Sequence, residues 1–196
     1  MATTSFEVEV KIAIKDPKKI EGVLIEMGSV KTNRETQVDT YFNHPCRSFE
    51  TTDEALRLRT REKIAISNQA GNIPATKIEL TYKGPKLDTT TKTRLELSVG
   101  IRDTESIRAI LIQLGFQEVA TIVKDRIFFA LEGMIASIDH VDKVGSFLEV
   151  ETVVDSEDRI PSAREEILSF VEKIGLRRTD SIRESYLELF LRKLHS

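Results

Sequence analysis

The chain has 196 residues, with 29 Lys and Arg against 32 Asp and Glu, so its formal net charge is −3. This length favours one domain with a real hydrophobic core, and a composition that is 40% hydrophobic and 31% charged excludes wholesale disorder. The balanced charge gives no general reason to expect nucleic acid or an anionic membrane as a partner. One cysteine, Cys46, excludes an internal disulfide.

Targeting signals are absent from the sequence. The first ten residues, MATTSFEVEV, carry two glutamates where a signal peptide needs a basic start and an apolar core. No stretch approaches the roughly 18 apolar residues of a membrane-spanning helix. We therefore expect a cytoplasmic protein without a membrane partner.

An internal repeat is the most informative feature of the chain. Shifted by 87 residues, the segment Glu7 to Gly28 aligns without a gap with Arg94 to Gly115. Identical pairs include Asp16/Asp103, Leu24/Leu111 and Gly28/Gly115. Each copy has an alternating strand, an aspartate at a helix N-cap position, an amphipathic helix and a glycine at its end. We predict a two-fold pseudo-repeat, with halves of about 5–87 and 92–155, in a single domain over 1–196.

The predicted elements follow in chain order. A strand over 6–12 leads into a helix over 17–27, and three strands follow around 36–43, 55–64 and 76–84. Ser67 to Pro74 is rich in turn residues and predicts a hairpin connection. The second half repeats the order with a strand over 94–99, a helix over 104–114 and strands around 120–131, 134–140 and 147–154. Two amphipathic segments, about 161–174 and 179–194, predict C-terminal helices.

Charged residues occupy one face of nearly every predicted strand. In chain order they include Glu7, Glu9, Lys11, Arg57, Arg59, Lys83, Arg94, Glu96, Lys124, Arg126, Asp139, Glu149 and Glu151. A single strand with this alternation indicates only that one of its faces is exposed to solvent. The apolar faces of the whole set need to be covered, and the helices can cover them from outside, so we expect the charged faces to point inward. The pattern predicts an α+β fold: an eight-stranded antiparallel, closed or nearly closed β-barrel with helices packed outside.

Two kinds of charge share this predicted interior. The basic set suits a polyanion, because guanidinium and ammonium groups complement phosphate oxygens. The acidic set supplies oxygen ligands for hard divalent ions such as Mg²⁺ or Mn²⁺. Together they are typical of phosphoryl chemistry, and since the sequence lacks a P-loop motif, side chains would have to bind the phosphates.

The motifs resemble those of the CYTH superfamily, the triphosphate tunnel metalloenzymes. EVEVK (Glu7, Glu9, Lys11) fits the ExExK signature, and LRLR, LTYKG, TRLELS, KDR, SIDHV and GSFLEVE follow in the family order over about residues 5–190. QVDTYFNHP, TDEALRLR and LTYKGP look most like the class IV adenylyl cyclase branch. One departure is Ser98, where many members carry an acid, so Glu96 is kept as a structural or supporting residue.

The resemblance implies a tunnel that binds a triphosphate end-on with Mg²⁺ or Mn²⁺. Lys83, Arg94, Lys124 and Arg126 would hold the phosphates opposite Arg57 and Arg59, and Lys11 would act as orienter or proton acceptor at the reacting phosphate. Glu149 and Glu151, with one or both of Glu7 and Glu9, would hold the metal, and Asp139 would support them.

The leading function is adenylyl cyclase, converting ATP to cyclic AMP and pyrophosphate. The alternatives are a triphosphatase for tripolyphosphate, thiamine triphosphate or a nucleoside triphosphate, and a non-catalytic polyphosphate- or nucleotide-binding module. A homodimer is left open. Tyr186 and the C-terminal helix are expected to plug or pack the barrel.

Overall fold

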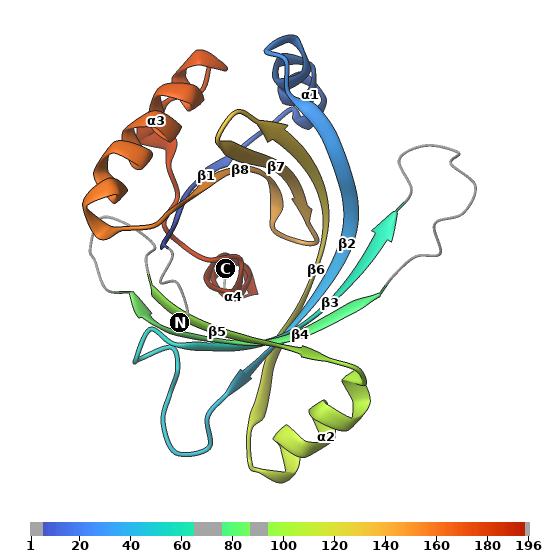
Figure 1. The fold of residues 1–196 in the computed structure, drawn as a ribbon. Helices are drawn as coiled ribbons and strands as arrows, with labels where there is room; N and C mark the ends of the chain where they lie inside the picture. Colours follow the sequence, from blue (N-terminus) through green and yellow to red (C-terminus); the bar gives the residue numbers. More distant parts are fainter. Residues whose placement is uncertain (1–5, 65–75, 87–93, 195–196) are drawn as a thin grey trace.

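The computed structural model describes residues 6–64, 76–86 and 94–194, so the predicted connection Ser67 to Pro74 lies outside the described residues. Eight strands and four α-helices make up this part of the chain (Figure 1). The elements are β1 (Phe6–Ala13), α1 (Pro17–Glu26), β2 (Val30–Asn43), β3 (Ala55–Ile64), β4 (Lys77–Lys86), β5 (Arg94–Ile101), α2 (Thr104–Gln113), β6 (Gln117–Leu131), β7 (Met134–Val141), β8 (Gly145–Val154), α3 (Ile160–Lys173) and α4 (Tyr186–Leu194). No described helix is both long enough and apolar enough to cross a membrane.

The strands form one antiparallel sheet in the order β1-β8-β7-β6-β2-β3-β4-β5. The order is symmetric with respect to the two halves. When each strand is replaced by its counterpart (β1 with β5, β2 with β6, β3 with β7 and β4 with β8), the same order results, read from the opposite edge of the sheet. The sheet curls round toward a barrel (Figure 1), and no ladder joins its edge strands β1 and β5 among the described residues. The predicted α+β fold with a nearly closed antiparallel barrel is confirmed.

The helices α1 and α2 begin and end by the same local interactions. The Asp16 carboxylate accepts a hydrogen bond from the backbone N–H of Lys19, and Asp103 accepts one from that of Glu105. Each helix ends before a glycine at positive φ, 84° at Gly28 and 89° at Gly115. The aligned residues of the two copies therefore do adopt one local structure.

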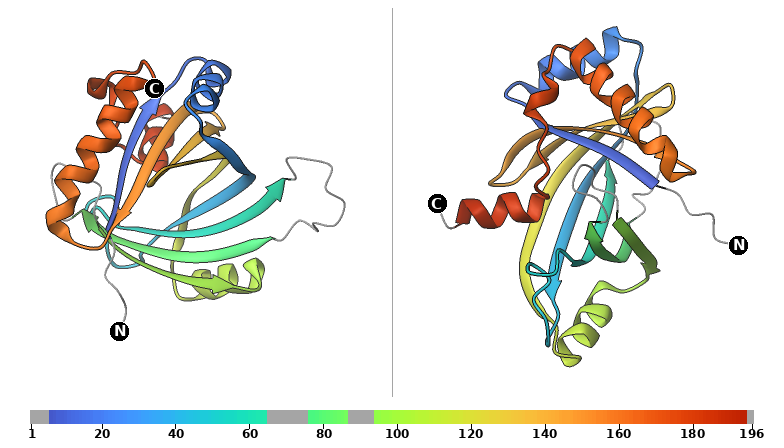
Figure 2. Two further views of the ribbon diagram at one scale, coloured as in Figure 1. Left: turned by 45° about the horizontal axis from the view of Figure 1, so that its top comes forward. Right: turned by 90° about the vertical axis from the view of Figure 1, so that its left-hand side faces the viewer.

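Helices cover the convex side of the sheet unevenly (Figure 2). Helix α3 packs on β1 and β8, where Val8, Val10 and Leu148 join its residues Ile167 and Val171 in the largest core cluster. Helix α2 contributes Leu111 to a smaller cluster with Phe42, Leu56 and Leu58 of β2 and β3.

The fourth helix differs from the prediction in extent and projects from one end of the curled sheet (Figures 1 and 2). Helix α4 begins at Tyr186 rather than near residue 179, because Ser185 and Glu188 form a reciprocal cap: Ser185 N–H donates to the Glu188 carboxylate, and Glu188 N–H donates to Ser185 Oγ. Before it, the chain runs beside β1, where Ile182 N–H donates to the carbonyl of Lys11 at 2.7 Å. Tyr186 and Leu189 then pack on Tyr41, Ile122 and Phe147. Helix α4 therefore closes one end of the barrel, as its apolar face suggests.

Candidate active site

The concave face of the sheet encloses a cavity of about 1290 Å³. Every predicted site residue except Asp139 lines it: Glu7, Glu9, Lys11, Arg57, Arg59, Lys83, Arg94, Lys124, Arg126, Glu149 and Glu151. Strand alternation explains this convergence, because residues two apart share one face of a strand. The structure thus brings together predicted site residues from six strands in one cavity.

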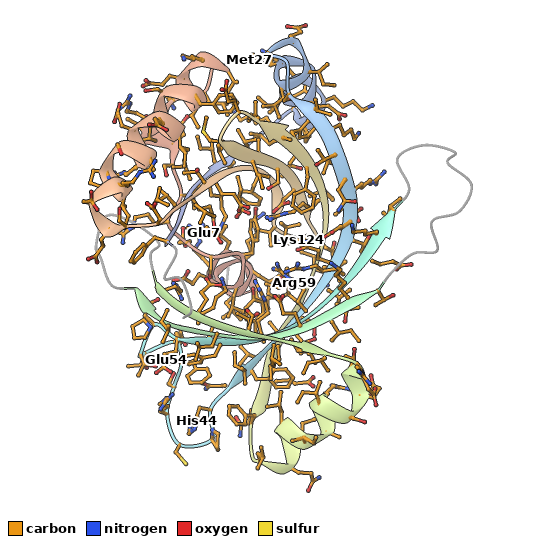
Figure 3. The ribbon with its side chains drawn as sticks, in the orientation of Figure 1. Glu7, Met27, His44, Glu54, Arg59 and Lys124 are labelled. Carbon is orange, nitrogen blue, oxygen red and sulfur yellow. The ribbon has the colours of Figure 1, made fainter. Side chains whose placement is uncertain are left out.

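Most of the predicted charged residues in the cavity fall into two groups by strand, although Lys11 lies on β1, and Glu79 and Glu96 line the cavity from β4 and β5. Glu7, Glu9, Glu149 and Glu151 lie on the neighbouring strands β1 and β8 and are called here the acidic wall. Arg57, Arg59, Lys83, Arg94, Lys124 and Arg126 lie on β3, β4, β5 and β6 and are called the basic wall. Figure 3 shows Glu7 on one side of the interior, with Lys124 and Arg59 on the other.

The acidic wall carries negative charge that is incompletely compensated. Burial, reinforced by the Glu7 carboxylate, raises the pKa of Glu151 to about 7. Burial and the Glu9 carboxylate likewise raise the pKa of Glu7. Glu149 differs, because its carboxylate accepts a hydrogen bond from Arg126 and lies 3.4 Å from the Lys11 ammonium. Glu7 and Glu151 are therefore the carboxylates of this wall that a bound cation would relieve most.

Asp139 lies behind the cavity wall and is fully buried. It accepts two hydrogen bonds from the Arg126 guanidinium, at 2.6 and 2.5 Å, and a third from the Tyr186 hydroxyl at 2.7 Å. The Lys124 ammonium is 3.6 Å away. Both carboxylate oxygens are thus engaged by protein groups, and the geometry suits orienting Arg126 and Lys124 better than holding a metal.

A second buried ion pair holds the other side of the basic wall. Arg59 donates from Nε and Nη2 to the two carboxylate oxygens of Asp39, each at 2.6 Å. Although burial alone would raise it, this guanidinium holds the pKa of Asp39 well below its usual range. Sequence reasoning missed Asp39. The available signal was its place on the inward face of β2, directly opposite Arg59 in the ladder.

Hydrogen-bonding capacity remains unused in the basic wall. The Nε of Arg57 and the amide oxygen of Gln37 are buried and have no hydrogen-bond partner among the described residues. Both residues line the cavity. Burial and the Arg57 charge lower the pKa of Lys83, even though its ammonium pairs with Glu96 at 2.5 Å. Crowded cations and an open donor are the features expected where an anion binds.

Tyr186 stands between the two lysines at the closed end. The ring centroid lies 4.0 Å from the Lys11 ammonium and 4.9 Å from the Lys124 ammonium. Lys11 is buried and also donates to the carbonyl of Glu184 at 3.0 Å. The start of α4 therefore fixes both ammonium groups by cation–π contacts and a hydrogen bond, a contribution that the sequence analysis had assigned to packing alone.

Comparison with known proteins identifies the architecture. The family model of the CYTH domain matches residues 5–186. The chain belongs to the CYTH domain family. A Methanocaldococcus jannaschii protein that carries the provisional name adenylate cyclase is 38% identical over 183 residues, covering 93% of this chain and 97% of that protein.

Two further comparisons agree with this membership. The adenylate cyclase CyaB of Aeromonas hydrophila is 25% identical over 185 residues, covering 94% of this chain and 88% of that protein. The structure of the PH1819 protein of Pyrococcus horikoshii superposes with a TM-score of 0.83 at 37% identity, covering 95% of this chain and 99% of that one. The predicted CYTH membership, nearest the adenylyl cyclase branch, is confirmed.

CYTH triphosphate tunnel enzymes generally depend on a divalent metal, so the acidic wall is the place to test for a fit. No three His, Cys, Asp or Glu side chains of the described residues gather closely enough to form a complete metal site. Mg²⁺ and Mn²⁺ do not require one, since Mg²⁺ is usually held by one or two carboxylates together with substrate phosphates and water. The burial and the repulsion from Glu7 that raise the pKa of Glu151 fit such a partial site.

Proposed function

We propose that this CYTH protein is a metal-dependent enzyme that acts on a triphosphate, and that its reaction converts ATP to cyclic AMP and pyrophosphate. The observation that carries the proposal is the pairing of an acidic and a basic wall in one cavity. A triphosphate with a divalent cation presents the complementary charges. A module that only binds polyphosphate would not need the acidic wall.

The residue roles follow from the contacts. Lys83, Arg94 and Arg57 would bind the phosphates from one side, while Arg126 and Lys124 bind from the other, oriented by Asp139. Glu151 and Glu7, with Glu9 and Glu149, would hold Mg²⁺ or Mn²⁺, which when bound would neutralise charge that develops on the phosphates. Lys11 would act as an orienting donor rather than a proton acceptor, because Glu149 and the Glu184 carbonyl favour its charged form.

In the cyclase reaction the ribose 3′-oxygen attacks the α-phosphorus and its proton passes to solvent water, while the bond from that phosphorus to the bridging oxygen breaks and pyrophosphate leaves. The task of the protein is then proximity and orientation, together with stabilisation of the leaving phosphates by the basic wall. The name of the M. jannaschii relative favours this reaction over hydrolysis.

Triphosphate hydrolysis is the second candidate. The same walls would bind the same phosphates, and a cavity of about 1290 Å³ has room for water beside a bound triphosphate. Tripolyphosphate, thiamine triphosphate and nucleoside triphosphates are the substrates to consider.

Product analysis distinguishes the candidates. Purified protein is incubated with ATP, tripolyphosphate or thiamine triphosphate, with Mg²⁺ or Mn²⁺, at mildly alkaline pH, and the products are separated by chromatography. Cyclic AMP with equimolar pyrophosphate supports the cyclase. Orthophosphate without cyclic AMP would reject the cyclase and support the triphosphatase. Tight binding without turnover of any substrate would reject both enzymes and support a binding module.

A further inference from the structure

The inward face of β2 carries two buried carboxylates whose surroundings differ. Asp39 is bound through both of its oxygens by the Arg59 guanidinium. Glu35, two inward positions earlier, is 7% exposed and lines the cavity, yet it forms no ion pair with any of the described residues. A buried carboxylate without a cation is costly to maintain unless it is hydrogen-bonded. Glu35 therefore needs an explanation that Asp39 does not.

Two neutral amides on the same strand hold the Glu35 carboxylate. Asn33 Nδ2 donates to one oxygen at 2.8 Å, and Gln37 Nε2 donates to the other at 2.9 Å. An ionised carboxylate can only accept hydrogen bonds, so Gln37 must turn its NH₂ group toward Glu35 and its carbonyl oxygen away from it. That carbonyl oxygen is buried and has no partner among the described residues. Glu35 and Gln37, called here the acceptor pair, thus retain unused acceptor capacity in the lining of the cavity.

The neighbouring cations are engaged elsewhere. Lys124 and Arg61 lie opposite Gln37 in the two ladders of β2. The Lys124 ammonium is 3.6 Å from Asp139, and Arg61 donates to Glu79 at 3.2 Å. A bound phosphate would not complete the acceptor pair either, because ionised phosphate also offers acceptors and is repelled by a carboxylate. The missing partner is a group that donates hydrogen bonds.

We propose that the acceptor pair, Glu35 and Gln37, binds the ribose hydroxyls of a nucleoside triphosphate and so selects nucleotides over inorganic polyphosphate. A ribose presents two adjacent hydroxyl donors to two adjacent acceptors. Glu35 also lies opposite Arg126 in the β2–β6 ladder, which places the pair beside a residue that is proposed to bind phosphate. This inference rests on the proposed binding of a triphosphate in the cavity, but it holds for either reaction.

Neutral hydroxyls suit the position better than a cationic group does. The acceptor pair lies on the side of the cavity that carries Arg61, Lys124 and Arg126, so a positively charged moiety would be repelled there. A nucleoside is then favoured over thiamine as the organic part of the substrate. Binding thiamine triphosphate more tightly than ATP would contradict this choice.

The proposal predicts opposite effects on two ligands when Glu35 loses its charge. Recognition of the hydroxyls should weaken, because an acceptor of a charge-assisted hydrogen bond is lost. Binding of tripolyphosphate should not weaken, because a negative charge that repels it is removed. A residue that only supports the fold would affect both ligands in the same direction.

Calorimetric titration of the metal-free full chain with ATP, 2′,3′-dideoxyATP and tripolyphosphate tests the proposal. We expect the natural chain to bind ATP about tenfold more tightly than the dideoxy analogue, or better. Glu35→Gln and Gln37→Leu should each bring this ratio close to unity, and Glu35→Gln should bind tripolyphosphate at least as tightly as the natural chain. Glu62→Gln is the matched control, because Glu62 is exposed and lies outside the cavity lining, and it should leave the ratio unchanged.

Thermal melting shows which variants are folded, and Glu35→Gln should fold because it keeps the size of the side chain and removes a buried charge. Equal affinity of the natural chain for ATP and its dideoxy analogue overturns the inference, and that comparison needs no variant. So does a preference for ATP that survives in the folded variants, or an equal loss of ATP and tripolyphosphate binding in Glu35→Gln. If the natural chain binds none of the three ligands, the proposed triphosphate site itself fails.

Discussion

The acidic wall and the basic wall differ in how far protein contacts already satisfy their charges. On the acidic wall, burial and repulsion among carboxylates raise the pKa values of Glu7 and Glu151. On the basic wall, Arg59 and Arg126 are each held by a buried aspartate, while Arg57 keeps an unsatisfied Nε and Lys83 has a lowered pKa. Two buried ion pairs, Asp39–Arg59 and Arg126–Asp139, thus form a rigid frame for the basic wall, and Arg57 Nε is an unsatisfied donor beside it. The acidic wall depends more on a ligand.

The two ion pairs that form the frame of the basic wall occupy equivalent positions in the two halves of the pseudo-repeat. A shift of 87 residues carries Asp39 of β2 onto Arg126 of β6, and the two ladders place Arg59 and Asp139 opposite them. The Asp39–Arg59 pair and the Arg126–Asp139 pair are therefore counterparts with their charges exchanged. Each half therefore contributes one buried ion pair at the corresponding ladder position.

Removing a residue of this frame should have the largest effect on stability. Arg126→Ala leaves the fully buried Asp139 without its main counter-charge, so we expect the free energy of unfolding to fall by about 3–5 kcal/mol. Urea denaturation measures the change. Arg61→Ala, which removes a part-exposed contact to Glu79, is the matched control and should cost less than about 1 kcal/mol. Equal losses in the two variants would contradict the distinction between frame and cavity lining.

Neutralising the acidic wall should abolish most turnover while sparing the fold. Glu151→Gln keeps the size of the side chain and removes its charge, so we expect turnover to fall by on the order of 10²-fold or more. The empty protein should be no less stable, because the repulsion from Glu7 is relieved. Glu132→Gln, an exposed acid outside the cavity lining, is the control. Activity near that of the natural chain, with unchanged metal dependence, would remove Glu151 from the metal site.

The residues of the basic wall that lie outside the two buried ion pairs should contribute to binding rather than folding, and Lys83, which pairs with the part-exposed Glu96, is the one to test. Lys83→Ala should lose a charge-assisted contact of roughly 1.5–3 kcal/mol, which is about tenfold or more in the dissociation constant for tripolyphosphate. Calorimetric titration measures this constant. Thermal melting gives an independent reading, since a ligand that binds only the folded state stabilises it by RT ln(1 + [L]/Kd). If millimolar tripolyphosphate with Mg²⁺ leaves the melting temperature of the natural chain unchanged, the phosphate tunnel itself is in doubt.

The sequence predicts most of this cavity because strand alternation fixes which side chains point inward. That rule placed Lys83, Arg94 and Glu151 on the cavity surface without any knowledge of the ladders. It could not show that Asp139 lies behind the cavity wall, because that depth depends on the hydrogen bonds from Arg126 and Tyr186. Nor could it find Asp39, whose importance comes from the register that sets it opposite Arg59.

The fold was predictable to a similar depth. The N-cap aspartates and the terminal glycines determine where α1 and α2 begin and end. A signal of the same kind is present at Ser185 and Glu188, where a capping box marks the start of α4. The predicted helix over 179–194 was too long because amphipathic spacing continues past that cap. The exposure of the apolar outer face of β5 was beyond sequence reasoning, since periodicity shows an apolar face but not what covers it.

The smallest expected effect is the uptake of a proton from solution when a phosphate ligand binds to the basic wall. Burial and the Arg126 charge lower the pKa of Lys124 to about 7, so at pH 8 most of this amine is neutral in the empty protein. A bound triphosphate raises that pKa, and binding must then take up a proton from solution, approaching one per site near pH 8. Below pH 7 the amine is already charged, so this uptake should decline.

Calorimetric titration of metal-free protein with tripolyphosphate, in two buffers of different ionisation enthalpy, measures the protons taken up. Lys124→Arg is the matched variant, because a guanidinium stays charged throughout this pH range and can still contact phosphate. It should bind with a smaller proton uptake at pH 8 and the same uptake as the natural chain at pH 6. Glu151, with a pKa also near 7, contributes to both proteins and cancels in the difference. Equal uptake by the two proteins at pH 8 would mean that Lys124 is charged before the phosphate arrives, and that Asp139 outweighs burial at this end of the cavity.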